Sequence, residues 1–230
     1  MPLFGLLADD ELSTLEAGAR KANFANGEML FTQDEPSDIV FKIISGVAKL
    51  DRMLPDGRRH IEGFALPGYF LGISMSPRRN FGAQALGNVV ALRLELTVFR
   101  RFVFESPRLL RQLFNLAGRE IDAAHELTVT LGHKNAEDRV LWFLAEMRER
   151  WEPINGWCDR IPLPMTRTDI ADRLGLTIET VSRTISKLAR DKVIAVEKGA
   201  VRIIDNGRFS SIGRPERAPL VTPESLMATY

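Results

Sequence analysis

Residues 168–188 read TDIADRLGLTIETVSRTISKL and contain two short helical patterns joined by a tight connection. Ile170 and Leu174 are spaced as i and i+4, which places both on one face of the first helix. Gly175 suits the end of that helix because glycine tolerates a positive φ. Thr177 is a good N-cap for a second helix, whose apolar residues recur at i, i+4 and i+7. This spacing predicts a helix-turn-helix, with two ordinary amphipathic helices of an all-α domain as the alternative.

The other face of the second predicted helix is polar and rich in hydrogen-bond donors, which suits a helix that enters the major groove of DNA. Arg183 carries a planar fork of donors that matches O6 and N7 of guanine. Threonine, serine and lysine side chains suit phosphate oxygens instead. We expect base contacts from Glu179, Ser182 and Arg183, and backbone contacts from Thr168, Thr177, Thr180, Ser186 and Lys187.

The composition is that of a globular chain without a global basic field. The 230 residues are 45% hydrophobic and 27% charged, with a net charge of +1, so DNA binding must rest on a local patch. No apolar run is long enough to span a membrane, and the first residues do not resemble a signal peptide. A single cysteine, Cys158, cannot form a disulfide framework. We therefore expect a cytoplasmic protein with no membrane partner.

Short apolar runs alternate with turn residues from residue 22 to about residue 105, after a short predicted helix at 9–21. Asp56-Gly57 between two of the runs indicates a β-hairpin. Strands at this spacing predict a small antiparallel barrel or jelly roll. The clearest runs are residues 39–44, 47–53, 59–64 and 89–94.

A long helix is predicted to begin at Ser106 and Pro107, as N-cap and first helical residue. Its residues at alternating spacings of four and three form a heptad stripe: Leu110, Phe114, Ala117, Ile121, Ala124, Thr128 and Leu131. A second apolar row, at Leu109, Leu113 and Leu116, covers only the first half. We therefore expect the first half to pack on the barrel and the stripe to form a dimer interface. A single buried helix with two apolar faces is the alternative.

The C-terminal part is predicted to hold a capped helix, the helix-turn-helix and a wing. Gly132 should end the long helix and Asn135 should cap the next one, while residues 151–160 read as a loop. Residues 193–196 and 201–204 form the hairpin of the wing, and the polar residues 207–230 are predicted to be disordered. The expected domains are a barrel over 1–105, a dimerisation helix over 106–133, a winged helix-turn-helix over 134–206 and a tail over 207–230.

Residues 39–46, the hairpin at Asp56-Gly57, the stretch LPGYF at 66–70 and residues 165–188 together resemble the CRP/FNR superfamily. This superfamily is that of the cyclic AMP receptor protein and the fumarate–nitrate reductase regulator, and the resemblance covers about residues 24–205. It is most similar to the FixK-like branch, whose members carry a run close to I-A-D-x-L-G-L-T-x-E-T-V-S-R.

The resemblance implies an α+β fold with a double-stranded β-helix (jelly-roll) sensor barrel, a long dimerisation helix and a C-terminal winged helix-turn-helix. It implies a homodimeric transcription activator whose partners are double-stranded DNA and RNA polymerase. The arrangement of Glu179, Ser182 and Arg183 is similar to that of regulators that read a TTG half-site. The resemblance therefore implies a TTG-N8-CAA-like inverted repeat.

The chain departs from the ligand-binding branches of this family. Cyclic-AMP binders carry a glutamate after the F-x-G turn, where this chain has Ile73, and an arginine with a small residue near 80–83, where it has none. Cys158 alone cannot supply the four thiolates of an iron–sulfur cluster. We therefore expect no metal, no cofactor and no dependence on cyclic nucleotides.

The input signal stays open between a small-molecule effector, haem-based sensing of nitric oxide, redox control, and a barrel that binds nothing in a protein controlled by its abundance. Haem would need His60, His125 or His133 as an axial ligand, and redox control would need Cys158. Arg78 and Arg79 belong to a solvated loop, or they contact an anionic effector or the polymerase. A metal-dependent enzyme of the cupin type is the alternative from another class. It would need clustered histidines, whereas His60 is alone in the barrel stretch, so we expect no enzyme.

Overall fold

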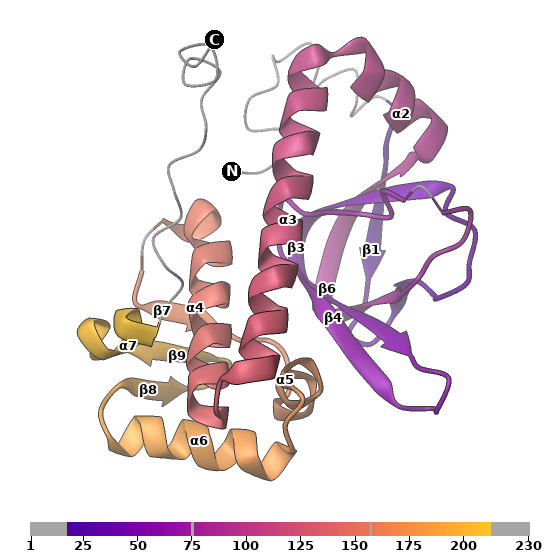
Figure 1. Cartoon of the computed structure of the whole chain (residues 1–230). Coiled ribbons are helices and arrows are strands. Elements are labelled where there is room, and N and C mark those ends of the chain that lie inside the picture. Colours follow the sequence, from indigo (N-terminus) through magenta and orange to yellow (C-terminus); the bar gives the residue numbers. More distant parts are fainter. Residues whose placement is uncertain (1–17, 75, 157, 213–230) are drawn as a thin grey trace.

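The computed structural model describes residues 18–74, 76–156 and 158–212, and it consists of a barrel, a long helix and a winged helix (Figure 1). All strand pairs of the barrel sheet are antiparallel, in the order β1-β6-β3-β4, with β2 added to β6 and β5 to β3. The strands are β1 (Arg20–Phe24), β2 (Met29–Phe31), β3 (Ile39–Met53), β4 (Arg59–Ala65), β5 (Phe70–Leu71) and β6 (Gly82–Glu95).

The predicted runs 39–44 and 47–53 form the single strand β3, which passes Ser45 and Gly46 through register shifts against β6. Gly46 has a φ of +82°, and an added Cβ would lie 2.2 Å from the Asn88 carbonyl oxygen, so the irregular pairing depends on glycine here. The hairpin predicted at Asp56-Gly57 is confirmed between β3 and β4. Residues 18–21 of the helix predicted at 9–21 are not helical, and Arg20 and Lys21 belong to β1, so the prediction is wrong there; residues 9–17 lie outside the described residues.

Two helices follow the barrel, although the sequence pattern predicted only the second. The first is α2 (Leu96–Glu105), whose buried Leu96, Phe99 and Val103 share one face. The second is α3 (Pro107–His133), and the Ser106 hydroxyl caps its start as predicted. The second apolar row of α3 also packs as predicted, since Leu109, Leu113 and Leu116 join the cluster that contains Val40 and Phe99.

The C-terminal part contains four helices and a small sheet in the order β7-β9-β8, among the described residues. Its elements are α4 (Ala136–Asn155), β7 (Arg160–Pro162), α5 (Arg167–Leu174), α6 (Ile178–Arg190), β8 (Ile194–Glu197), β9 (Ala200–Ile203) and α7 (Asn206–Ile212).

Two predictions for this part are wrong. Residues 151–155 continue α4 instead of forming a loop, because Trp151 packs on the core and donates its Nε1–H to the Pro162 carbonyl at 3.0 Å. Residues 207–212 belong to α7 instead of a disordered tail, because Phe209 is buried beneath the Arg148 guanidinium. Residues 213–230 lie outside the described residues.

The winged helix packs directly against the barrel, with α5 beside β4 (Figure 1). Barrel residues Val47, Ile61, Phe64 and Leu66 share one buried cluster with α4, α5 and α6. The Phe64 and Phe143 rings meet edge to face, with centroids 6.0 Å apart. None of the helices in the described ranges is long and apolar enough to cross a membrane.

Candidate nucleic-acid interface

The predicted helix-turn-helix is confirmed, and local capping builds it. The Thr166 hydroxyl accepts from the Asp169 amide at 3.1 Å, and the Asp169 carboxylate accepts from the Thr166 amide at 3.0 Å, so a capping box starts α5. Gly175 ends α5 in the left-handed region, with a φ of 60°. Thr177 then caps α6 by accepting from the Thr180 amide at 3.2 Å.

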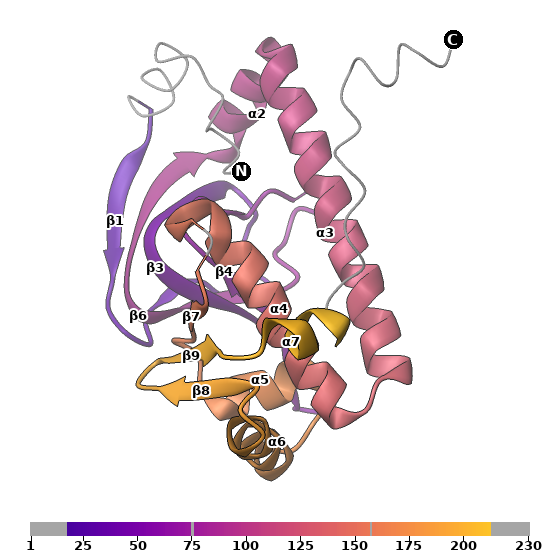
Figure 2. The same ribbon diagram turned by 90° about the vertical axis from the view of Figure 1, so that its left-hand side faces the viewer.

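Helix α6 lies at the end of the molecule away from α2, beside the wing strand β8 (Figure 2). Its own Val181, Ile185 and Leu188 are buried in the winged-helix core, which fixes the orientation of the helix. The opposite face is open to solvent. Glu179, Arg183, Ser186 and Lys187 on α6 are exposed, as are Thr177 at its cap and Thr168 on α5, while Thr180 and Ser182 are half-buried.

Glu179 and Arg183 form the charged centre of this face, one helical turn apart. Hydrogen bonds from its own backbone amide and from the Thr177 side chain, together with the nearby Arg183 charge, hold the pKa of Glu179 below its usual value. The carboxylate is therefore ionised at neutral pH and can only accept hydrogen bonds. The face thus combines one acceptor group with the donor fork of Arg183.

Lys187 is paired with an acidic residue that the sequence pattern did not single out. Its ammonium binds the carboxylate of Glu137, in the first turn of α4, and Arg208 lies 3.1 Å from the same carboxylate. The hydrogen bond from Lys187 is the main cause that lowers the pKa of Glu137. Any phosphate that binds Lys187 must therefore compete with Glu137.

The wing adds basic residues that were also not predicted. Lys198 is exposed at the turn between β8 and β9. Arg160 and Arg202 both pair with Glu197, at 2.9 Å and 2.7 Å, and about half of each arginine side chain is exposed. Lys198 and Arg202 in the predicted hairpin were the available signal for this group, whereas Arg160 lies outside that hairpin.

The heptad stripe of α3 is mostly uncovered in the single chain. Phe114 is 70% exposed and Ile121 is 55% exposed, although both are large and apolar. The other members follow the same trend: Ala117, Ala124 and Thr128 are exposed, and Leu110 and Leu131 are half-buried.

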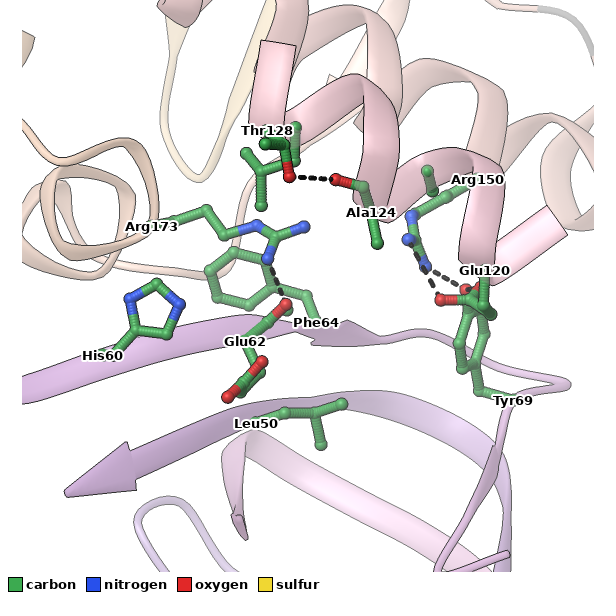
Figure 3. A pocket seen from close by; sticks show the side chains of 13 residues that line it. Leu50, His60, Glu62, Phe64, Tyr69, Glu120, Ala124, Thr128, Arg150 and Arg173 are labelled. Atoms are coloured by element: carbon green, nitrogen blue, oxygen red, sulfur yellow. Dashed lines mark hydrogen bonds and ion pairs between the residues drawn. The ribbon is translucent and has the colours of Figure 1, made fainter. Parts of the chain in front are cut away.

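A polar cavity of about 330 Å³ lies between β4, α3, α4 and α5 (Figure 3). Arg150 reaches into it and binds the Tyr69 hydroxyl and the carboxylates of Glu146 and Glu120. Burial raises the pKa of Tyr69. Arg173 donates to the Glu62 carbonyl on the other side of the cavity. Tyr69, Glu120 and the Glu62 carbonyl are distant in sequence from the arginines that they bind, so helical spacing gave no sign of the cavity.

The three histidines considered as haem ligands are spread over the fold. His60 lines the cavity, whereas His125 and His133 lie on exposed parts of α3. Cys158 is half-buried, and its thiol donates to the Arg160 carbonyl at 3.0 Å. Within the described ranges, no three His, Cys, Asp or Glu side chains are grouped so that they could hold a metal ion.

The loop with Arg78 and Arg79 is only partly solvated. Arg78 is exposed and donates to the Asp34 carbonyl at 2.7 Å. Arg79 is only 5% exposed, stacks on the Phe31 ring and donates to the Ile39 carbonyl at 2.7 Å. Burial lowers its pKa. The expectation of a solvated side chain is therefore wrong for Arg79, which ties this loop to the barrel.

Two family models match the chain: a cyclic nucleotide-binding domain over residues 21–106 and a Crp-like helix-turn-helix domain over residues 138–210. The nitrogen fixation regulation protein FixK of Bradyrhizobium diazoefficiens is 44% identical over 202 residues, which are 88% of this chain and 85% of that protein. The transcriptional activatory protein AadR of Rhodopseudomonas palustris is 40% identical over 212 residues, 92% of this chain and 89% of that protein. The structure of FixK2 from Bradyrhizobium japonicum matches with a TM-score of 0.77 and 28% identity, over 86% of this chain and 98% of that one.

Proposed function

The chain belongs to the CRP/FNR family of DNA-binding transcription regulators, in its FixK-like branch, and we propose that it is a homodimeric activator that reads a TTG-N8-CAA-like inverted repeat. Its relatives are transcription regulators and not enzymes. The proposal places it in the cytoplasm, with RNA polymerase as a further partner. The single observation that supports it most is the solvent-facing side of α6, where Glu179, Ser182 and Arg183 lie together.

Base reading follows from the chemistry of these side chains. Arg183 donates two parallel hydrogen bonds to O6 and N7 of a guanine in the major groove. Glu179, held ionised beside it, accepts from the N4 amino group of a cytosine and orients Arg183. Ser182 is short enough to meet a thymine methyl group or a phosphate.

The backbone contacts set affinity and orientation, and carry no sequence information. Thr168, Thr177, Thr180, Ser186 and Lys187 approach the phosphates beside α6, and Lys198 and Arg202 add charge from the wing. A phosphate on Lys187 replaces the carboxylate of Glu137, so this contact adds less affinity than a free lysine would.

The dimer pairs the heptad stripes of two α3 helices. An interface between identical stripes is closed, so it produces a two-fold pair and no larger assembly. The two α6 helices then read half-sites about one helical turn, roughly 10 bp, apart. The exposure of Phe114 and Ile121 supports this arrangement.

Cyclic nucleotides are not the input in this proposal, and no cofactor is required. Ile73 offers no acceptor for a ribose hydroxyl. Arg79, the buried arginine just before residues 80–83, already binds the Ile39 carbonyl and the Phe31 ring, so it does not replace the missing phosphate-binding arginine. Calorimetric titration with cyclic AMP should show no binding in the micromolar range; heat of binding there would contradict this part.

A panel of base substitutions at the guanine of the half-site tests the reading mechanism. Arg183→Ala should cost about 1–3 kcal/mol at the cognate site and remove the preference for guanine. Lys187→Ala should weaken binding to all sequences about equally and reduce the salt slope by about one unit. Both variants are titrated beside the wild type at fixed salt. An Arg183→Ala protein that still prefers guanine as strongly as the wild type would refute the assignment.

A further inference from the structure

One side chain, Arg139 in the first turn of α4, connects three separate parts of the backbone. Its Nη2 donates to the Leu131 carbonyl at 2.7 Å, in the last turn of α3. Its Nε donates to the Lys134 carbonyl at 2.9 Å, in the connection to α4. Its Nη1 donates to the Leu174 carbonyl at 3.1 Å, at the last residue of α5.

The helix ends explain why an arginine occupies this position. The last carbonyls of a helix have no partner within the helix and carry the negative end of its dipole, so a cation is favoured there. The ends of α3 and α5 both face the same guanidinium. A planar guanidinium donates to the three carbonyls from three separate nitrogens in a fixed geometry, whereas an ammonium has three donors on a single nitrogen.

Through Arg139, the three carbonyls connect the end of α3 with the end of α5, just before the turn into α6. Leu131 is the last member of the heptad stripe of α3. Leu174 immediately precedes the turn 175–177 that leads into α6 at Ile178. Gly175, the first residue of that turn, also lies against Arg139, because an added Cβ would be 3.8 Å from Nη1.

We propose that Arg139 is a positioning residue that sets the separation of the two α6 helices in the dimer, and thereby the spacing of the half-sites. The inference rests on the proposed function, since it needs a dimer and an inverted repeat. Each winged helix keeps its own folding core without Arg139, because α4, α5 and α6 share buried Val140, Ile170 and Val181. The loss of Arg139 should therefore loosen the joint between α3 and the winged helix, while the solvent-facing side of α6 stays intact as the reading face.

Spacing then becomes the property that reports on Arg139. A dimer gains affinity from its second half-site only when both reading helices fit at once, and this gain reaches about 10²–10⁴-fold. A rigid joint confines the gain to one spacer length. A loose joint spreads it over several lengths and reduces it at the best one.

The test uses duplexes with one TTG half-site, and with inverted repeats whose central spacers are seven, eight or nine base pairs long. The wild type should prefer eight base pairs by at least about tenfold. Arg139→Ala should keep the wild-type affinity for the single half-site within about twofold. Its affinity for the repeat with the eight-base-pair spacer should fall about tenfold, and its affinities for the three repeats should differ by no more than about threefold. The spacing preference of Arg139→Lys should lie between those of the wild type and Arg139→Ala.

Arg183→Ala is the matched control, because it removes the same side chain from the reading face. It should lose affinity on every duplex and keep the spacing preference.

A second measurement reports on the joint without DNA. A nitroxide at position 186 of the variant Ser186→Cys, in a Cys158→Ser background, gives the distance between the two α6 helices by pulsed electron spin resonance. Adding Arg139→Ala should broaden this distribution, while adding Arg183→Ala should leave it unchanged.

An unchanged distance distribution and an unchanged spacing preference in Arg139→Ala would overturn the inference. If Arg139→Ala does not fold, Arg139→Lys carries the same comparison, and wild-type behaviour in both measurements would overturn it. A wild type that ignores the inverted repeat would instead refute the proposed function, and the spin-label distances would still report on Arg139.

Discussion

Asp169 shows how much one residue contributes here, because it supports both the start of α5 and the contact of α5 with the barrel. One carboxylate oxygen accepts from the amide and hydroxyl of Thr166, at 3.0 Å and 2.7 Å. The other lies 3.4 Å from Lys49 Nζ and 3.1 Å from Arg59 Nη2, both on barrel strands. Burial alone would raise the pKa of Asp169, but the Thr166 hydrogen bonds and the two cations together hold it below its usual 3.8.

Asp169→Asn should lower the free energy of unfolding by about 3 kcal/mol at neutral pH, because the buried Lys49 ammonium loses this carboxylate. The pKa of Asp169 is lower in the folded than in the unfolded chain, so its stabilisation is complete above about pH 5 and is lost as the pH falls below about 4. The difference between wild type and variant should therefore shrink from about pH 5 to about pH 3. Urea unfolding at fixed protein concentration measures it, and a difference that stays constant would contradict this role.

Residue-level prediction succeeded where the partners are close in sequence. Glu179, Ser182 and Arg183 lie within about one helical turn, so helical spacing alone places them on one face. It failed for Arg139, whose acceptor at Leu174 is 35 residues away, and for Glu137, which pairs with Lys187 across 50 residues. Such contacts depend on how the helices pack, and the local pattern does not contain that information.

Helices, like single residues, were predicted where the contacts that define them are close in sequence. The starts of α3, α4 and α6 were predicted because Ser106, Asn135 and Thr177 cap them through hydrogen bonds three residues along the chain. Helix α2 was missed because Val98, Phe99, Phe102, Val103 and Phe104 are residue types typical of strands. Its helical state depends on burial of Phe99 and Val103 against α3, which overrides their preference.

The heptad stripe of α3 makes a prediction at the scale of this element. Ile121→Glu should separate the proposed dimer into monomers at micromolar concentration, because it places two like charges in an interface with no partner for either, at a cost of about 3 kcal/mol or more. Analytical ultracentrifugation measures the change. Val129→Glu is the matched control, since Val129 is also apolar and 51% exposed on α3 but lies outside the stripe. If the Ile121→Glu protein still sediments as a dimer, the interface is elsewhere.

At the scale of the described molecule, the barrel and the winged helix share one buried core beside the polar cavity. The cluster that contains Ile61 and Phe64 of the barrel also contains Phe143 and Leu144 of α4, and all four are at most 2% exposed. Ion pairs extend the same contact outward, such as Arg59 with Asp172 at 2.6 Å. A change in the barrel therefore acts on the winged helix through packed side chains.

This shared core predicts that barrel and winged helix unfold together. Phe64→Ala should lower the free energy of unfolding by about 3–5 kcal/mol, because it leaves a cavity beside Phe143. All three tryptophans, at positions 142, 151 and 157, lie in the C-terminal part, so their fluorescence reports on that part alone. In urea, the fluorescence transition of Phe64→Ala should shift as far as the transition seen by circular dichroism.

Phe31→Ala makes the test stricter, because Phe31 belongs to the separate cluster inside the barrel and stacks on Phe41. A barrel that unfolded by itself would leave the tryptophan signal of Phe31→Ala where the wild type has it, and would split the circular dichroism transition in two. In a single cooperative unit, a cavity inside the barrel lowers the stability of the winged helix as well. The tryptophan transition of Phe31→Ala should therefore move to lower urea, at the same protein concentration as the wild type so that the proposed dimerisation contributes equally.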